Sequence, residues 1–421
     1  MTSEVCVMNR HALVLAADSA TTVSQWTGEK REIRYFKGAN KIFQVSNHHP
    51  VGLMIFDGAD ILGVPWEIIA KRFRAQLDNK SFNTIEGYAE EFCEFLEGDP
   101  TLFPAEVQKE AVFSAIKAAA YGMALEVRDR DGVADEDWTA HFDALIAAER
   151  VELDAVASHV RLPQDFLDAT LAGWKLELTA EITAYLADPV PQPTDYESLT
   201  ELAFLMVAKN PGLHLGTTGL VFCGYGDHDI FPSYVHNVSS GMFAGKHLLQ
   251  QVKREAVTHS VPAQITGFAQ TGMIDTFQLG VDSEVFRDVV GCFDNSMVSF
   301  VEALTAGGAD QLPADQVAKM RSDARKKFMD EWFEKTRNQH IYPLKRVLAS
   351  LPISEMAELA ETLINLQSLK EKVTKPSETV GGPIDVAVIT KSEGLVWIKR
   401  KHYFDPALNA RFMARHVGLY S

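Results

Sequence analysis

The chain has 421 residues, of which 46% are hydrophobic and 23% charged, a composition that fits one large globular domain or two. Its net charge of −17 argues against a nucleic-acid surface, because phosphate binding requires clustered Lys and Arg. Four scattered cysteines and 13 histidines without an HExxH pattern argue against a disulfide framework and a zinc site, and no cofactor is expected.

No targeting or membrane segment is predicted. The chain does not open on a basic stretch followed by an apolar one, as a signal peptide would, and it contains no apolar run of about 18 residues. We therefore expect a cytoplasmic protein in which no propeptide precedes residue 2.

The first predicted element is a β-hairpin. Two short apolar runs, Glu4–Met8 and Ala12–Ala17, are joined by the polar Asn9-Arg10-His11. Apolar runs of this length around a polar turn are typical of paired strands. The second run ends at Asp18-Ser19.

Thr2 precedes this hairpin and follows only the initiator methionine. Removal of Met1 would leave a threonine with both a hydroxyl and a free α-amine. Such an amine titrates near pH ~8, so at neutral pH part of it can accept the hydroxyl proton. One residue would then supply nucleophile and base.

The pattern of residues 21–97 predicts a second set of strands followed by helices. Residues Thr21–Lys37 are polar and predict a loop that leads into a short strand near Ile33–Phe36. Apolar patterning then predicts strands at Lys41–Val45 and Val51–Phe56 and helices at Ile61–Leu77 and Glu86–Glu97.

Residues 101–210 are rich in Ala, Leu and Glu and almost free of strand patterns. They predict helices at about 104–128, 136–160, 164–187 and 195–209, with a proline-rich connector before the last. We interpret this segment as a helical insertion.

Strand patterns return after the insertion, at Gly219–Tyr225, about Ser233–Val238 and Ala263–Phe268. A helix is predicted from Met273 to Leu279, and residues 284–372 are predicted to be helical throughout. Two closing strands are predicted at Ile384–Thr390 and Leu395–Lys399.

Several of these segments together resemble a known family. The runs TSEVCVMNRHALVLAADSATTV, GANKIF and PVGLMIFDGAD look like the start of a proteasome β subunit or its bacterial relatives, which are N-terminal nucleophile (Ntn) hydrolases. The end of the chain, GGPIDVAVITKSEGLVWIKRKHYF, looks like the closing hairpin of the same family. The resemblance covers roughly residues 2–80 and this last stretch.

The resemblance implies a catalytic set. Without gaps, the nucleophilic threonine, the aspartate and the lysine of the family fall on Thr2, Asp18 and Lys41. The Thr2 hydroxyl would attack an amide carbonyl, the charge of Lys41 would lower the pKa values of the hydroxyl and amine, and Asp18 would hold Lys41. Taken singly, each residue has an ordinary structural explanation, and only their joint spacing favours catalysis.

The supporting residues depart from the family pattern. The oxyanion-hole glycine falls on Phe56, a bulky residue that would narrow the site, so backbone N–H groups near Asp57 and Gly58 are the expected donors. The second aspartate falls on Ser377, with Glu378 as its candidate substitute. The helix-start serine of the family is best matched by Thr271, less well by Gln270, and Gly381-Gly382 stand at its small-residue turn.

The resemblance also implies an α+β fold, the four-layer αββα sandwich of the Ntn hydrolases, here with large helical insertions. The domain boundaries that follow are a first core part at 1–100, a helical insertion at 101–210, a second core part at 211–283, a helical segment at 284–375 and a closing hairpin and tail at 376–421.

Our first hypothesis is a proteasome-like threonine amide hydrolase, a peptidase that acts through an acyl-enzyme in a homo-oligomer. A small-molecule amidase of the same fold is an alternative, because a fold does not determine a substrate. A second alternative is a non-catalytic scaffold subunit. Expected partners are a peptide or amide substrate and an unfoldase or assembly partner, with no nucleic acid and no membrane.

Overall fold

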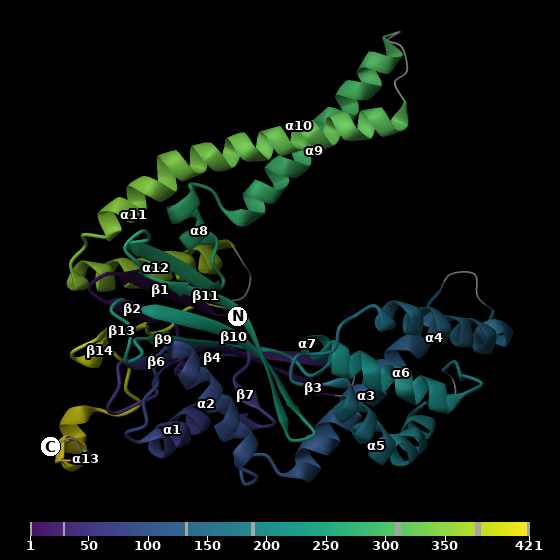
Figure 1. Cartoon of the computed structure of the whole chain (residues 1–421), viewed down its shortest axis with the longest axis horizontal. Helices are drawn as coiled ribbons and strands as arrows, with labels where there is room; N and C mark the ends of the chain where they lie inside the picture. The colour runs from purple at the N-terminus through teal and green to yellow at the C-terminus, as the bar shows by residue number, and fades with distance from the viewer. Residues whose placement is uncertain are drawn as a thin grey trace.

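The computed structural model describes residues 2–27, 30–130, 134–186, 190–307, 313–374 and 380–418. Two five-stranded sheets lie at its centre with helices around them, and every strand pair in them is antiparallel (Figure 1). The predicted mixture of helices and antiparallel strands is therefore confirmed.

The first sheet joins the two ends of the chain. Its strands lie in the order β12 (Ala263–Ala269), β1 (Ser3–Asn9), β2 (Leu13–Ala17), β13 (Asp385–Thr390) and β14 (Gly394–Lys399). Both predicted hairpins, the first and the last, form here. Because Ala17 pairs with Asp385, the residues after β2 lie beside those before β13.

The second sheet consists of internal segments. Its order is β11 (Lys246–Ala256), β10 (Ser233–Phe243), β9 (Thr218–Gly224), β6 (Val51–Phe56) and β5 (Ile42–Gln44). Strand β11 was not predicted, because most of its side chains are polar and show no apolar alternation, and pairing with β10 holds it.

Alternate side chains on each strand point to opposite faces of a sheet, and both faces of these sheets are packed. The inner faces share one apolar cluster, in which Cys6, Met8 and Leu15 of the first sheet meet Met54 and Val221 of the second. This shared cluster places the two sheets face to face.

Helices cover the outer faces. Val5, Val7 and Val14 of the first sheet pack in one cluster with helices α8 (Gly272–Leu279) and α12 (Ile353–Thr374). The outer residues of the second sheet pack with α1 (Trp66–Leu77) and α2 (Ile85–Gly98).

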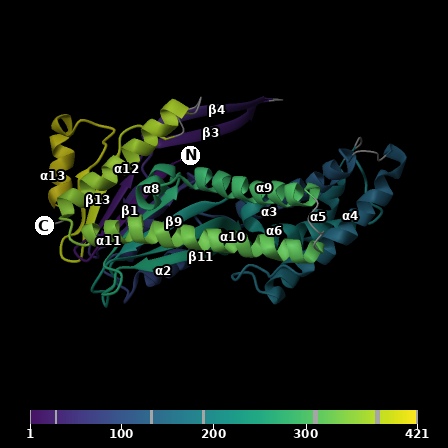
Figure 2. The same ribbon diagram turned by 90° about the horizontal axis from the view of Figure 1, so that it is seen from above.

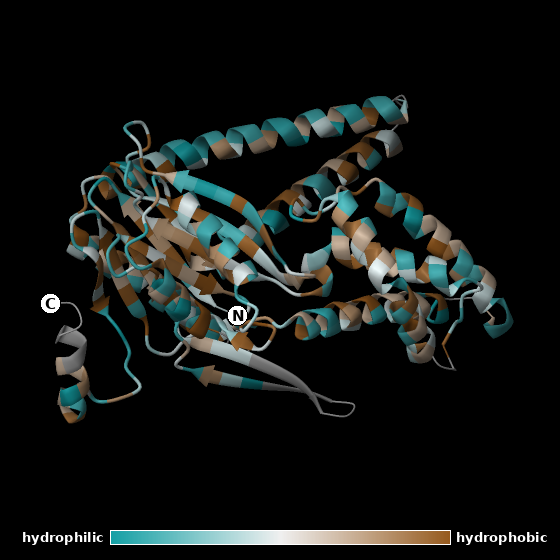
Figure 3. Ribbon diagram, turned by 60° about the horizontal axis from the view of Figure 1, so that its bottom comes forward, coloured by the Kyte–Doolittle hydropathy of each residue, from teal (hydrophilic) through white to brown (hydrophobic). Residues whose placement is uncertain are grey.

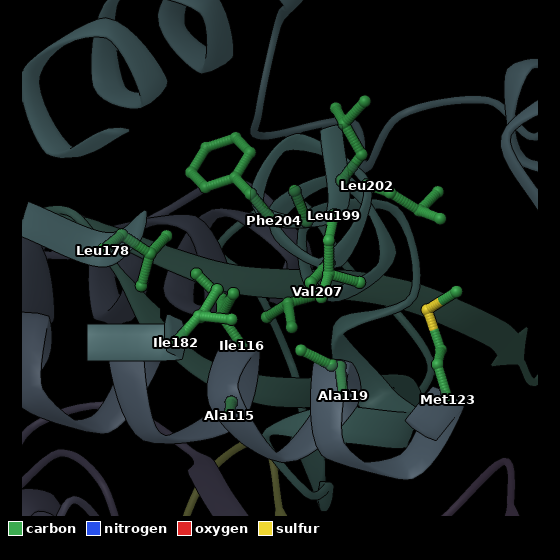
Figure 4. Packing of buried hydrophobic residues seen from close by; sticks show 14 of the residues in the cluster. Ala115, Ile116, Ala119, Met123, Leu178, Ile182, Leu199, Leu202, Phe204 and Val207 are labelled. Carbon is green, nitrogen blue, oxygen red and sulfur yellow. The ribbon is translucent and has the colours of Figure 1, made fainter. Parts of the chain in front are cut away.

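The insertion has a hydrophobic core of its own. It contains α3 (Ala105–Arg128), a 3-10 turn (Asp135–Asp137), α4 (Trp138–Asp154), α5 (Gln164–Tyr185) and α6 (Tyr196–Lys209). The short helix α7 (Pro211–His214) follows it. Figure 4 shows the packing of Ile116, Leu178 and Val207 in this cluster. Phe243 and Leu248, at the tip of the β10–β11 hairpin, complete it.

A pair of long helices lies above the sheets in Figure 1 and is seen from above in Figure 2. They are α9 (Ser283–Ala306) and α10 (Ala314–Thr336), and a π-helical turn (Arg337–Ile341) and α11 (Tyr342–Leu348) follow. The rings of Phe293 and Phe328 stack at 4.5 Å between them. The long helix at the top of Figure 3 is mostly hydrophilic, and Thr336 is the only buried residue among those described in α10.

Two expectations about local structure were wrong. Residues Thr21–Lys37 are not a loop with one short strand but a hairpin of β3 (Ala20–Thr27) and β4 (Lys30–Lys37), because β-branched and aromatic residues favour strands even in polar sequence. The helix expected from Ile61 begins only at Trp66, after the short strands β7 (Asp60–Ile61) and β8 (Val64–Pro65). The described residues of the segment predicted to be helical, 284–372, form several helices, in agreement with the prediction.

The chain ends in a 3-10 turn (Pro406–Asn409) and helix α13 (Ala410–Gly418), neither of which was predicted. Across the described parts of the chain, no helix combines the length and apolarity that a membrane crossing requires.

Candidate functional site

Thr2 lies directly before β1, an inner strand of the first sheet, and its backbone extends the pairing of β1 with β12. Its carbonyl accepts a hydrogen bond of 3.0 Å from the N–H of Gln270, and the Ser3 hydroxyl donates to the Gln270 carbonyl at 3.1 Å. Only 6% of Thr2 is exposed. These two hydrogen bonds hold the Thr2–Ser3 segment against Gln270.

Lys41 reaches Thr2 from the second sheet. It stands directly before β5, and its carbonyl accepts a hydrogen bond of 2.9 Å from the N–H of Ile55 in β6. Its Nζ donates to Thr2 Oγ1 at 2.7 Å and to Asp18 Oδ1 at 2.5 Å. Because the sheets face each other, two residues 39 positions apart meet in a buried polar contact.

Asp18 is fully buried and accepts four hydrogen bonds. Oδ1 accepts from the Ser3 N–H at 3.1 Å and from Lys41, and Oδ2 accepts from the Ala20 N–H at 3.2 Å and the Gly381 N–H at 2.8 Å. Hydrogen bonds to an ionised carboxylate are among the strong ones. The carboxylate therefore has one orientation and directs Lys41 Nζ to Thr2.

The turn after β6 carries the expected oxyanion donors. Asp57 has φ 69°, in the left-handed region that side chains rarely adopt. The Gly58 N–H already donates to the Phe56 carbonyl at 3.1 Å, whereas no described residue accepts from the Asp57 N–H. A Cβ on Gly58 would lie 2.0 Å from Thr218 Oγ1, so only glycine fits. The Asp57 N–H is consequently the candidate donor of this turn.

The ring of Phe56 does not line an open site. It is 8% exposed and lies between the sheets, with its centre 5.3 Å from that of His236 and 5.8 Å from that of Phe268. Gly219, on the neighbouring strand, makes room for the ring, because a Cβ there would lie 2.1 Å from it. The bulk of Phe56 is accommodated by the core.

The other supporting residues are placed differently from what the resemblance implied. Gln270, not Thr271, lies opposite Thr2. The Thr271 hydroxyl donates to Asp275 Oδ2 at 2.8 Å, within the first turn of α8. Ser377 and Glu378 lie outside the described residues, so the candidate substitute for the second aspartate stays a prediction.

Glu4 is a residue of this region that the motif comparison missed. It follows Thr2 by two positions on β1, is fully buried, and neither of its carboxylate oxygens has a hydrogen-bond partner among the described residues. Burial raises the pKa of Glu4 well above its ordinary value, Lys41 opposes this shift, and Asp18 and Asp57 add to it. A glutamate inside an otherwise apolar strand was the available signal.

The arrangement supplies a hydroxyl, a cation and an oriented carboxylate, which is the chemistry of an activated oxygen nucleophile. Among the described residues, no group of three or more His, Cys, Asp or Glu side chains could hold a metal ion.

Comparisons with known proteins correct the resemblance. No family model matches the chain, and no curated protein matches it. Similar solved structures include the helical assembly of the Anbu complex from Pseudomonas aeruginosa, with 10% identity, a TM-score of 0.27 and coverage of 99% of this chain and 94% of that chain. Another is an Anbu (Gly-1) mutant from Hyphomicrobium sp. strain MC1, with 10% identity, a TM-score of 0.26 and coverage of 100% and 95%.

These similarities are distant and too low to carry an argument about activity. The assignment of this chain to the proteasome β subunits and related bacterial Ntn hydrolases, made from its opening and closing motifs, is therefore wrong. What the comparisons support is a distant structural similarity to Anbu proteins.

Proposed function

We propose that this protein hydrolyses amide bonds with Thr2 as its nucleophile. The observation that carries the proposal is the contact of Lys41 Nζ with Thr2 Oγ1 at 2.7 Å and with Asp18 Oδ1 at 2.5 Å, in a buried setting. A lysine held between a hydroxyl and a carboxylate stabilises the alkoxide that attack requires.

The reaction requires removal of Met1. The freed α-amine of Thr2 then takes the proton of Oγ1, directly or through a water, while Oγ1 attacks the amide carbonyl. The Asp57 N–H stabilises the oxyanion, and the proton passes to the leaving amine as the C–N bond breaks. Water, deprotonated by the α-amine, hydrolyses the acyl ester and restores Thr2.

The proposal extends to the layers of the fold, the domain boundaries and the oligomeric state. The order of helices, sheet, sheet and helices supports a four-layer αββα sandwich, and the separate cluster of α3 to α6 supports an insertion at 101–210. The remaining domain boundaries, the homo-oligomer and the unfoldase stay predictions. More than half of the surface of Phe300 on α9 and of Met320 on α10 is exposed. These exposed apolar side chains support an association between copies of this chain.

The proposal is tested by the intact mass of the purified protein before and after incubation with a threonine-directed β-lactone. We expect loss of Met1 and a single adduct, absent in Thr2→Ala and retained in Thr183→Ala, whose hydroxyl lies on the exposed side of α5. Unlabelled protein would then be assayed with peptides and with small amides, which separates the peptidase from the amidase, and the labelled protein, whose nucleophile is blocked, serves as the inactive control.

A retained Met1, or a free N-terminal Thr2 that forms no adduct, would overturn the catalytic proposal. That result would favour the non-catalytic scaffold, and the oligomeric state measured by light scattering would become the next experiment.

A further inference from the structure

A second cavity, of about 730 Å³, lies at the edge of the two sheets and contains none of the residues Thr2, Asp18 and Lys41. Helix α1 and strand β5 form one wall, and the chain after β14 together with α13 forms the other. The size is within the range of small-molecule sites. Figure 1 shows α13 below the sheets, on the same side as α1.

The cavity is strongly cationic in a protein of net charge −17. Five Lys or Arg side chains line it, against the single carboxylate of Glu67. Lys71 pairs with Glu67 at 2.6 Å, and Lys401 pairs with Asp385. Within the described chain, no carboxylate lies within ion-pair distance of the guanidinium of Arg74 or Arg400. Two guanidinium groups thus remain for a ligand.

Of Arg74 and Arg400, Arg400 gives the stronger indication of a bound ligand. Its guanidinium lies 3.8 Å above the ring of Trp397, which fixes its plane. Its Nη1 is buried and has no hydrogen-bond partner among the described residues. A buried, unsatisfied donor in a native structure requires an explanation. An acceptor oxygen of a bound anion would satisfy it.

Aromatic side chains stand beside these cations. Tyr403 and Phe404 line the cavity, and Phe404 packs edge-on against Phe412 at 5.2 Å. Tyr403 is 98% exposed, so its ring has an open face. An open aromatic face near guanidinium groups suits a ligand with both a planar ring and acidic oxygens.

We propose that this cavity binds a nucleotide, with its phosphates on Arg74 and Arg400 and its base against Tyr403 and Phe404. A guanidinium group can donate two parallel hydrogen bonds to phosphate oxygens. Because the cavity contains few carboxylates, these donors are available to a ligand. The ring contact distinguishes a nucleotide from a simple polyanion.

The test is isothermal titration calorimetry of the full-length protein with ATP, tripolyphosphate and adenosine. We expect ATP to bind, tripolyphosphate to bind at least about tenfold more weakly, and adenosine not to bind at millimolar concentration. Equal binding of tripolyphosphate and ATP would overturn the nucleotide in favour of a phosphate site, and no binding of ATP would overturn the site itself.

Variants localise the binding. Arg400→Met and Arg74→Met should each weaken ATP binding at least about tenfold, while Arg346→Met, an exposed arginine of α11 outside the cavity, should not. Arg74 lies on the surface of α1, so its variant remains informative if Arg400→Met fails to fold. Unchanged affinity in Arg74→Met would contradict the proposal.

Discussion

The backbone N–H of Gly381 donates a hydrogen bond of 2.8 Å to Asp18 Oδ2, across 363 positions of sequence. This bond ties the closing hairpin to the candidate site. Gly381 has φ 147° and Gly382 φ 83°, both in the region that favours glycine, and a Cβ on Gly382 would lie 2.6 Å from Ser19 Oγ. The glycine pair is therefore needed for the chain to pass so close to Asp18.

Asp18→Asn should destabilise the protein. Each oxygen of Asp18 accepts from two donors, so either orientation of an asparagine places its NH2 group against two of them. Breaking a buried pair of this kind costs about 3 kcal/mol. Urea denaturation measures the change, and Asp323→Asn, at an exposed position of α10, is the control that should leave the midpoint unchanged.

Lys41→Met should slow acylation of Thr2 by a β-lactone about 100-fold, because the side chain keeps its length and loses the charge that stabilises the alkoxide. The rate is measured by intact mass on protein with an unchanged circular dichroism spectrum. Lys109→Met, which removes an exposed pair with Glu177, should leave the rate unchanged. An unaltered rate in Lys41→Met would remove the lysine from the mechanism.

Glu4→Gln should stabilise the protein increasingly as the pH rises. The pKa of Glu4 is raised in the folded state, chiefly by burial, so the wild type loses stability as the pH rises from the unfolded value of about 4.3 through the folded one. Glutamine has no proton to lose. We expect the gain over wild type to be larger at pH 7 than at pH 5, measured by urea denaturation.

Glu255→Gln is the control for Glu4→Gln, because the pKa of Glu255 is shifted in the opposite direction. Burial opposes the shift, but hydrogen bonds from Tyr234, Lys253 and Thr266 outweigh it and lower the pKa of Glu255. Its stabilising contribution is therefore present above the unfolded pKa and lost as the pH falls. Glu255→Gln should be less stable than the wild type at pH 7, and parallel pH trends in the two variants would refute this account.

The contact of Thr2, Asp18 and Lys41 was expected from the resemblance of the opening motifs, whereas strand and turn patterns placed these residues only near strand ends. The resemblance that supplied their roles named a wrong family. The hydrogen bond from Gly381 was out of reach, since it depends on which distant strands become neighbours. Glu4 was missed although a glutamate inside an apolar strand marks it in the sequence. The hairpin of β3 and β4 was missed because its polar residues carry no apolar alternation.

Thr271→Ala should leave acylation of Thr2 within about twofold of the wild type, because the Thr271 hydroxyl donates to Asp275. It should cost about 1 kcal/mol of stability through the lost hydrogen bond. Ser283→Ala, which removes a 2.6 Å bond to the same oxygen of Asp275, is the matched control and should behave alike. A much slower acylation in Thr271→Ala alone would place Thr271 in the mechanism.

Gly219→Ala should disturb the turn that carries the Asp57 N–H. The new Cβ would lie 2.1 Å from the Phe56 ring, so the ring and the residue after it must move. Overpacking of this kind costs about 1 to 3 kcal/mol, and acylation should slow because the oxyanion donor shifts. Gly122→Ala, in open space on α3, should instead be neutral or stabilising.

A double-mutant cycle tests whether the Phe56 ring causes the effect of Gly219→Ala. Phe56→Leu removes the outer ring atoms that the new Cβ would meet. The double variant should therefore lose less stability than the sum of the two single losses, by about 0.5 to 3 kcal/mol, and should recover part of the acylation rate. Additive losses in urea denaturation would show that the strain of Gly219→Ala lies elsewhere, and the turn after β6 would then be independent of this packing.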